Sequence, residues 1–559
     1  MKRPFTIWSV VGSIVLASAM LLVTAPSPAL AAPGDTLTVN ASPAGNLNNV
    51  IQGDTLSNGA RAHPNRVYRL YRDSIYYFNA PINVTFPLTI IADSGSHRPP
   101  VIAPAINPDN SSPSKFLNIY SGTHNLTLRY LYLTGVRPDQ VTLGSKFNDC
   151  IDFSSDSTVS IVRNCVFESY GGALDLNSGN YNKFFVYDNV FRNMMHPTSW
   201  FKGEAFLSVG GFTTDSVVMI NNTMFCNNAY AKASVDYTLY TRFEHNTIFL
   251  NCVNPLNDFV MTSAEYKNNI FYGTCANAQE NAEIQQYYFE NSISPSSTFS
   301  FDSLNTGPSH IPVTESNRVI TVQNNSVYWP AKLKAFWLTP LMDTLIPPVF
   351  LNVRTAGMFA NKSFYPYFKI GGNDTTNDPG FPAGVLGQVD SLIKFASLIR
   401  LGTQTNPGFL WNYNPNGNLF APVWPLPENL AYSNTTMQHQ GTDGYALGDL
   451  NWFPSQRAAW LLTGVATRAT APESFSLAQN YPNPFNPSTT IQYALSKAQN
   501  VQLKVYNLLG QEVATLVDGR MAAGFHSVQF NAARLASGVY IYKIVAGDFV
   551  STKKMILLK

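Results

Sequence analysis

Three aspartates, Asp149, Asp152 and Asp175, are the residues of this chain best placed for metal or acid–base chemistry. Apolar residues alternate on both sides of Asp152 and Asp175, so a strand through either position sends its apolar neighbours inward and the carboxylate outward. Neighbouring carboxylates repel one another unless a cation or a shared proton relieves them. The three aspartates can therefore bind Ca²⁺, act as general acid and base in an inverting glycosidase, or remain solvated surface residues.

Lys202 is the candidate for a catalytic base near these aspartates, since it lies two residues before Glu204 and one repeat beyond Asp175. A lysine that abstracts a proton needs a depressed pKa. A second outward column of polar residues recurs along the chain, each just before a bend. This set can bind an acidic sugar or form a mixed solvated face, and it consists of Arg129, Arg163, Tyr187, Asn221, His245 and Lys267.

The elements that must position these residues come from an internal repeat. One phrase, ending in an aromatic residue, recurs as RNCVF, YDNVF, NNTMF, HNTIF, KNNIF and NNSVY, with the final aromatics at 167, 191, 225, 249, 271 and 328. The first five aromatics are 24, 34, 24 and 22 residues apart. Two or three short strands in each period predict the coil of a parallel β-solenoid, because a βαβ unit would need a longer helical crossover.

In a solenoid, equivalent positions of successive coils stack about 4.8 Å apart and form columns of like residues. We expect an interior aromatic column of Phe167, Phe191, Phe225, Phe249 and Phe271. The asparagines three residues earlier, Asn164, Asn222, Asn246 and Asn268, are expected to form a hydrogen-bonded ladder at a bend rather than a ligand site.

With these repeats, residues 36–455 resemble the right-handed parallel β-helix proteins of the pectin-lyase-like superfamily. The resemblance implies an all-β fold with an N-terminal cap and long C-terminal side loops over 278–318 and 331–440. A capping helix is expected near Val389–Leu401.

Polysaccharide lyases of that superfamily often hold calcium in an outward acidic cluster, with a lysine or arginine as base. The resemblance thus implies a polysaccharide partner, Ca²⁺ at Asp149, Asp152 and Asp175, and Lys202 as base. No lyase signature can be matched residue by residue. Motifs of nucleophilic serine, HExxH zinc and nucleotide-binding enzymes are absent from the sequence.

Residues 1–31 have the pattern of a secretory signal peptide, with Lys2-Arg3, an apolar stretch and Ala29-Leu30-Ala31; an N-terminal membrane anchor is the alternative. We expect no membrane span in the mature chain.

The net charge of +2 over 559 residues, with 13% charged residues, gives no attraction to nucleic acid. Five cysteines without a CxxC pair argue against a structural zinc site and leave the number of disulfides open.

Residues 473–559 are expected to form a separate small immunoglobulin-like β-sandwich after a linker at 456–472, since alternating strands are broken by turn signals about every ten residues. The phrases FSLAQNYPNPFNPSTTI from 475, VYNLLGQEV from 505, LASGVY from 535 and KKMILLK at the end resemble the C-terminal sorting domain of type IX secretion cargo.

The second resemblance implies export through the periplasm, recognition by the type IX secretion machinery, and a secreted or outer cell-surface location. Lys553 and Lys554 would belong to the sorting signal. A sandwich that binds substrate or a partner is the alternative.

Three kinds of function remain open: a polysaccharide-active lyase or hydrolase of uronate-containing glycans, a noncatalytic glycan-binding β-helix, and an adhesive or structural surface protein. Proteins of all three kinds can have this fold, so the fold alone does not decide among the three functions.

Overall fold

The computed structural model describes most of the chain, and all structural statements below concern its described residues: 35–41, 47–120, 124–141, 149–196, 202–209, 212–280, 296–304, 314–339, 345–403, 411–418, 420, 423–462, 476–477, 480, 483–495, 499–521, 524–547 and 549–558. The chain divides into two compact units with a boundary at residues 465 and 466. The predicted signal peptide, residues 1–31, lies outside the described residues.

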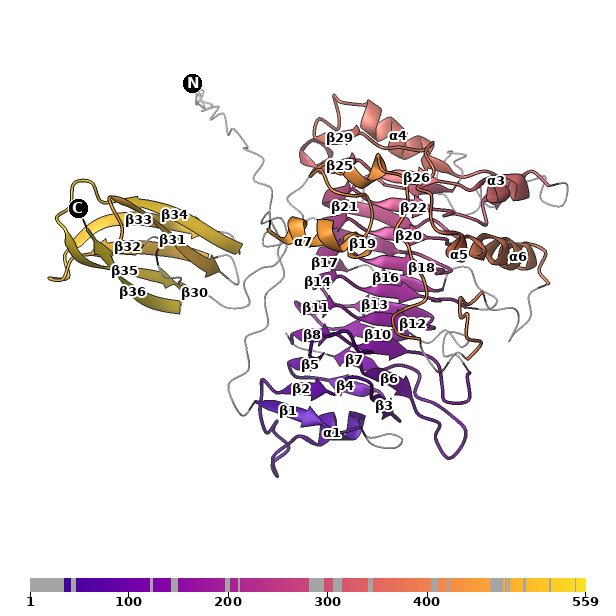
Figure 1. The fold of residues 1–559 in the computed structure, drawn as a ribbon, viewed down its shortest axis with the longest axis horizontal. Helices are drawn as coiled ribbons and strands as arrows, with labels where there is room; N and C mark the ends of the chain where they lie inside the picture. Colours follow the sequence, from indigo (N-terminus) through magenta and orange to yellow (C-terminus); the bar gives the residue numbers. More distant parts are fainter. Residues whose placement is uncertain are drawn as a thin grey trace, which may run out of the picture. The chain divides into compact units, whose positions relative to one another are not determined.

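The first unit is a parallel β-helix whose coils stack one above the next (Figure 1). Each coil passes through three faces in turn. The first face consists of β4 (Ile82–Val84), β7 (Leu117–Tyr120), β10 (Asp149–Ser154), β13 (Gly172–Ser178) and β16 (Glu204–Ser208). The second face consists of β1 (Thr36–Val39), β2 (Val67–Leu70), β5 (Leu88–Ala92), β8 (Leu126–Arg129), β11 (Val159–Arg163), β14 (Lys183–Tyr187) and β17 (Thr213–Ile220).

Two long strands, β19 (Lys232–Glu244) and β21 (Leu256–Lys267), join these two faces, and β25 (Val319–Gln323) and β29 (Phe368–Gly371) continue the second face. The third face is a nine-stranded parallel sheet. It consists of β3 (Ile75–Phe78), β6 (Val101–Pro104), β9 (Tyr132–Thr134), β12 (Val166–Glu168), β15 (Val190–Arg192), β18 (Thr223–Phe225), β20 (Thr247–Phe249), β22 (Ile270–Tyr272) and β26 (Ser326–Tyr328). The predicted β-solenoid is thereby confirmed.

The aromatic residues of the repeats form two columns, so the expected single interior column is wrong. Phe191 pairs with Met224, not with Phe225. The interior column is Phe167, Phe191, Met224, Ile248, Phe271 and Val327. Phe225, Phe249, Tyr272 and Tyr328 stack on the other side of the sheet, with neighbouring ring centroids 5.2, 5.2 and 5.6 Å apart.

An asparagine ladder sets this register. Each ladder amide donates to the side-chain oxygen of the next coil at 2.8 to 3.1 Å, through Asn189, Asn222, Asn246, Asn269, Asn325 and Asn373. Asn222 and Asn246 were expected in it. Asn164 and Asn268 lie one residue earlier, where the backbone takes a positive φ of 54° and 59° that asparagine tolerates better than most residues.

Replacing Asn246 with alanine is expected to lower the free energy of unfolding by about 1–3 kcal/mol, because buried backbone groups lose their partners. Asn246 donates to the Met219 carbonyl at 2.9 Å and accepts from the Asn222 backbone N–H at 3.0 Å. Urea denaturation compares this variant with Asn416→Ala, an exposed turn residue. Equal midpoints for the two variants would contradict a stabilising role of the ladder.

The region expected as side loops holds more structure than predicted. It contains β29, which adds a further strand to the second face, and α6 (Gln388–Arg400), a helix at the expected position that lies beside the coils (Figure 1) and contacts α3 (Ala331–Trp337). The other helices of the first unit are α1 (Leu47–Gly53), α4 (Val353–Ala360), α5 (Ala383–Leu386) and α7 (Pro454–Leu462), with 3-10 turns η2 (Glu315–Asn317), η4 (Met437–His439) and η5 (Leu450–Trp452). Two short ladders join β23 (Gln279–Glu280) to β27 (Leu345–Ile346) and β24 (Ser297–Phe299) to β28 (Val349–Leu351).

Residues 442–460, here called the strap, return along the coils. Arg457 of α7 contacts the Asp188 carboxylate at 2.5 Å, and Asp449 accepts from the Thr223 hydroxyl at 2.7 Å. Helix α7 thus continues to Leu462 through residues that the sequence assigned to the linker. The helix extends this far because it is amphipathic: Trp460 is buried against Asp443, and its indole N–H donates to Asp443 at 3.0 Å.

The second unit is an antiparallel β-sandwich, as predicted. One sheet orders β30 (Ser476–Leu477), β31 (Ser488–Leu495) and β34 (Gly524–Asn531); the other orders β33 (Glu512–Met521), β32 (Gln499–Tyr506), β35 (Gly538–Ala546) and β36 (Phe549–Leu557). Alternate residues of both sheets form one core.

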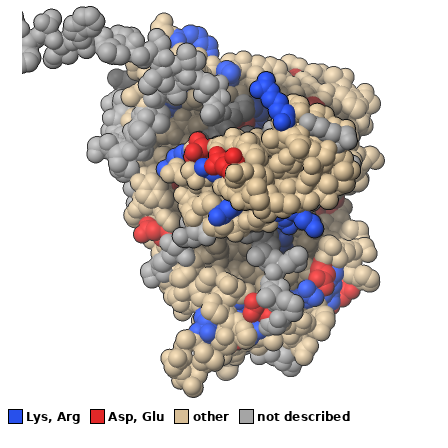
Figure 2. Space-filling view, turned by 90° about the vertical axis from the view of Figure 1, so that its left-hand side faces the viewer, with Lys and Arg blue, Asp and Glu red and all other residues tan. Residues whose placement is uncertain are grey.

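Charged residues are sparse on the face shown in Figure 2, where uncharged residues predominate and the two signs lie in small groups. All five cysteines are buried free thiols. Among the described residues, no helix combines the length and apolar character needed to cross a membrane.

Candidate active site

The predicted aspartates lie on the first face, where β10, β13 and β16 are neighbours, with Asp149 at the start of β10. Asp152 pairs with Asp175, which confirms that the two share one column, and Asp149 pairs with Gly172, which in turn pairs with Glu204. The inward neighbours of Asp175 are buried in the core. Asp149 and Glu204 belong to a column at the start of these strands, three residues before the column of Asp152 and Asp175, and the two columns together bring carboxylates of three successive coils close to one another.

Lys202 lies at the centre of three of these carboxylates. Its Nζ is 3.2 Å from Asp149 Oδ1, 3.3 Å from Asp175 Oδ2 and 3.0 Å from Glu204 Oε1. We call Asp149, Asp175, Lys202 and Glu204 the acid cluster. The side chains of Lys202 and Asp149 keep 23% and 14% of their surface exposed, while those of Asp175 and Glu204 keep 2% and 0%. A ligand therefore meets Asp149 and Lys202 first.

Gly172 makes room for the acid cluster. A Cβ atom at this position would lie 2.7 Å from Asp175 Oδ1 and 2.8 Å from Asp149 Oδ1, closer than real Cβ contacts allow. The carboxylates of both aspartates therefore lie directly above Gly172 of β13. Asp175 Oδ1 is buried and no donor to it is found among the described residues, which favours the protonated form of Asp175 beside the Asp149 carboxyl.

Burial and mutual repulsion raise the pKa values of the inner carboxyls. Burial is the main cause at Asp175, whose pKa rises well above 3.8, and the charges of Glu204 and Asp149 add to it. Burial likewise raises the pKa of Glu204 to about 7, against the lowering influence of Lys202. Near neutral pH the acid cluster therefore holds at least one proton on its carboxyls.

Lys202 has the opposite property from the one a proton-abstracting base needs. Burial disfavours its ammonium, but the carboxylates of Asp175, Glu204 and Asp149 outweigh burial and raise the pKa of Lys202 above its ordinary 10.5. The amine is therefore charged at every physiological pH. Lys202 fits a positioning role better than the expected role of lyase base.

Calcium was expected at Asp149, Asp152 and Asp175, and the structure does not bring this set together. Asp152 forms an ion pair with Lys115 instead, and Glu204 completes the group. One oxygen of each of Asp149, Asp175 and Glu204 lies within 4.8 Å of the others, which suits a hard cation. However, the Lys202 ammonium already occupies the position between them, so Ca²⁺ does not fit unless Lys202 moves away.

Glu204 was not among the predicted site residues, although the sequence held a signal for it. Gly172-Ala173-Leu174 and Glu204-Ala205-Phe206 are equivalent segments of adjacent coils, and this alignment places Glu204 two coils from Asp149 in the same column.

The second predicted set does not form one outward column. Arg129, Arg163 and Tyr187 are successive members, followed by Ile220, Glu244 and Lys267. Asn221 and His245 lie one residue later, at the positive-φ bend, so their assignment to the column is wrong.

The charged members of this column already have partners within the protein. Arg163 pairs with Asp188 at 3.1 Å and Lys267 with Glu265 at 2.9 Å, while Tyr187 is 5% exposed. Sugar binding by these residues stays a prediction.

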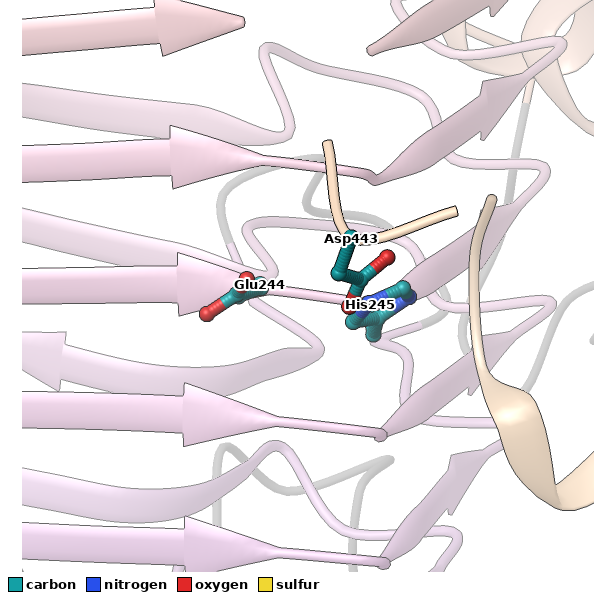
Figure 3. A group of neighbouring side chains, drawn as sticks. All are labelled: Glu244, His245 and Asp443. Atoms are coloured by element: carbon teal, nitrogen blue, oxygen red, sulfur yellow. Dashed lines mark hydrogen bonds and ion pairs between the residues drawn. The ribbon is translucent and has the colours of Figure 1, made fainter. Parts of the chain in front are cut away.

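His245 anchors the strap. Its Nε2 lies 2.9 Å from Asp443 Oδ2 and its Nδ1 lies 3.3 Å from the Gly448 carbonyl. Figure 3 shows His245 and Asp443 in contact, with Glu244 set to one side. Glu244, His245 and Asp443 are close enough to bind a metal ion, but each has a protein partner, since Glu244 pairs with Arg242. We interpret this group as a structural clasp.

A second buried ionic group was not predicted. Arg192 lies between Glu168 and Glu428, at 2.9 Å from the latter, and Tyr132 donates to Glu168 at 2.6 Å. Glu168 and Arg192 follow equivalent aromatic residues in adjacent coils, which is a readable signal, whereas Glu428 comes from far along the chain.

In the second unit, Lys553 and Lys554 lie on β36, the edge strand of the four-stranded sheet. Lys554 is exposed and Lys553 half-buried. Their role as a sorting signal stays a prediction.

Comparison with known proteins identifies this second unit. Residues 479–558 match the family described as secretion system C-terminal sorting domain. No curated protein matches the chain. The chain therefore carries a type IX sorting domain at its C-terminus, and it is a protein exported by that system to the cell surface or the medium.

Proposed function

We propose that the β-helix unit is a polysaccharide-active domain, related to the pectin-lyase-like superfamily, which acts at the acid cluster once the sorting domain has delivered it outside the cell. The observation that carries the proposal is the convergence of carboxyls from three successive coils on one partly open outer face. Strongly perturbed carboxyls in such a place are candidates for acid–base catalysis.

Hydrolysis suits this arrangement better than elimination. Asp175, whose pKa is raised, holds a proton that it shares with the neighbouring Asp149 carboxylate, and Asp149, at the exposed edge, passes that proton to the glycosidic oxygen. The Asp175 carboxylate then accepts a proton from the attacking water, which restores the shared proton. Lys202 and Glu204 hold the pair in place. The spacing within 4.8 Å is shorter than the ~6.5–9.5 Å between carboxyls in inverting glycosidases, which is why we propose a shared proton.

The charge of the acid cluster favours a neutral glycan over the uronate-containing one expected from the sequence. With at least one of the three carboxyls protonated, up to two carboxylates face the single ammonium of Lys202, so the acid cluster carries no positive charge that would attract the carboxylate of a uronic acid. Calcium could bridge the two, but Lys202 stands in the place of the ion.

A panel assay tests the proposal with the mature full-length chain. Neutral and uronate-containing glycans are incubated with Ca²⁺ or with a chelator, and both reducing ends and unsaturated products are followed. We expect reducing ends from a neutral glycan, equally with and without Ca²⁺. Calcium-dependent unsaturated product would instead establish a lyase and contradict the proposed hydrolysis.

A noncatalytic surface β-helix is the second candidate, favoured by the nearly complete burial of Asp175 and Glu204. Glycan binding without any product would support it. Neither binding nor product would point to an adhesive or structural role.

A further inference from the structure

A lysine and an aspartate face each other in the interior of the β-helix. Lys232 of β19 pairs with Leu256, and Asp258 of β21 pairs with Ser234, so both side chains lie on the inward, apolar side of their strands. Lys232 is 0% and Asp258 1% exposed. They belong to adjacent coils and are 26 residues apart in sequence.

Few polar groups surround the pair: Tyr266 lies beside Asp258, and the buried Ser234 and Ser208 precede Asp258 in its column. The Lys232 ammonium contacts Asp258 Oδ1 directly, and no other acceptor for it is found among the described residues. The Tyr266 hydroxyl donates to the other oxygen, Oδ2, at 2.5 Å. On its remaining side the ammonium lies 6.0 Å from the centroid of the Phe206 ring. An ammonium has three donors, so two lack an acceptor here.

We propose that Lys232 and Asp258 condense to form an intramolecular isopeptide bond that joins two successive coils covalently. The ammonium first passes a proton to the carboxylate, which gives a neutral amine beside a neutral carboxylic acid. Lys232 Nζ then attacks Asp258 Cγ, the Cγ–Oδ1 bond breaks, and Oδ1 leaves as water with two of the three ammonium protons. The third proton stays on the new amide nitrogen, so the step needs no oxidant or further reactant.

Three features of this place favour the condensation. Two charges without water are costly to keep in an apolar interior, and the amide removes both. Tyr266 O–H is already directed at Oδ2, where negative charge develops during attack, and so acts like an oxyanion-hole donor. Burial also lowers the pKa of Lys232, which increases the fraction of nucleophilic amine.

Peptide mapping of the denatured full-length protein tests the bond directly. Trypsin does not cut after an acylated lysine, so we expect a branched peptide joining residues 203–242 to residues 243–267, lighter than its parts by one water. Cleavage after Lys232, with residues 203–232 and 243–267 recovered at their unlinked masses, would overturn the proposal. Because the wild-type chain is measured unfolded, this outcome depends neither on a variant's stability nor on glycan activity.

Variants identify the chemistry. Asp258→Asn should give the same amide with loss of ammonia in place of water, whereas Asp258→Ser should give only unlinked peptides. Tyr266→Phe should slow the appearance of the branched peptide after expression. A branched peptide that persists in Asp258→Ser would show that another residue is the acyl donor and would contradict the assignment.

Discussion

Replacing Asp149 with asparagine is expected to lower the rate of glycan hydrolysis by a factor of about 10²–10⁴, the usual contribution of a general acid. Asparagine keeps the shape of the side chain and can still accept from Lys202 Nζ, which lies 3.2 Å from Asp149 Oδ1. It cannot release a proton to the leaving oxygen. The loss should therefore appear in kcat, with KM little changed.

The matched control is Asp390→Asn, which also removes one carboxylate paired with a lysine. Asp390 lies 2.8 Å from Lys332, and both are exposed. Wild-type and control rates should agree, and both should fall as the pH rises, because the raised pKa of Asp175 means that the shared proton is lost on the alkaline side. An Asp149→Asn variant that is folded and fully active would contradict the proposed role.

Replacing Lys202 with methionine is expected to lower the free energy of unfolding by about 3–5 kcal/mol at pH 8, because three nearly buried carboxyls lose their cation. Methionine fills a similar volume, so the effect is one of charge. The control Lys332→Met breaks an exposed pair and should cost at most about 1 kcal/mol. Chemical denaturation of both variants measures the difference, and equal unfolding midpoints would show that Lys202 does not neutralise the acid cluster.

The pH dependence of the stability loss in Lys202→Met follows from the direction in which the carboxyl pKa values are shifted. Carboxyls whose folded pKa is raised, such as Glu204 at about 7 against an ordinary 4.5, stabilise the fold at low pH and lose that contribution as the pH rises through the folded value. The deficit of the variant should therefore shrink at pH 5. With the ammonium gone, millimolar Ca²⁺ should stabilise the variant and leave the wild type unchanged.

The sequence was sufficient to predict the solenoid because its repeat has both a period and alternation. Few folds other than a solenoid accommodate coils of 22 to 24 residues with polar bends, and the sorting domain has specific phrases of its own at the C-terminus. The column shared by Asp152 and Asp175 followed from alternation alone.

The predicted register of the third face was wrong because the repeats were aligned on their aromatic residues, whereas the asparagines define the register. Phe225 and Phe249 are as apolar as Phe191, so hydrophobicity cannot distinguish an interior position from an outer position that later chain covers. The ladder distinguishes them, because Asn189, Asn222 and Asn246 must bond one another.

Contacts between residues that are far apart in the sequence leave no periodic pattern that could predict them. Glu428 beside Arg192 and Asp443 beside His245 are contacts across about 200 residues or more, and no local pattern announces them. Lys202 was found by proximity in sequence, but its charge state depends on three carboxyls whose burial only the folded chain defines.

The strap also fixes an order of events during biosynthesis. Coils can stack through contacts between residues some two dozen positions apart, whereas the contact of Arg457 with Asp188 closes a loop of 269 residues. Closure of so long a loop is entropically costly and slow. Asp188 therefore meets Arg457 only after 269 further residues, nearly half of the 559-residue chain, have been added, so the strap closes over coils that have already stacked and only when nearly the whole first unit is present.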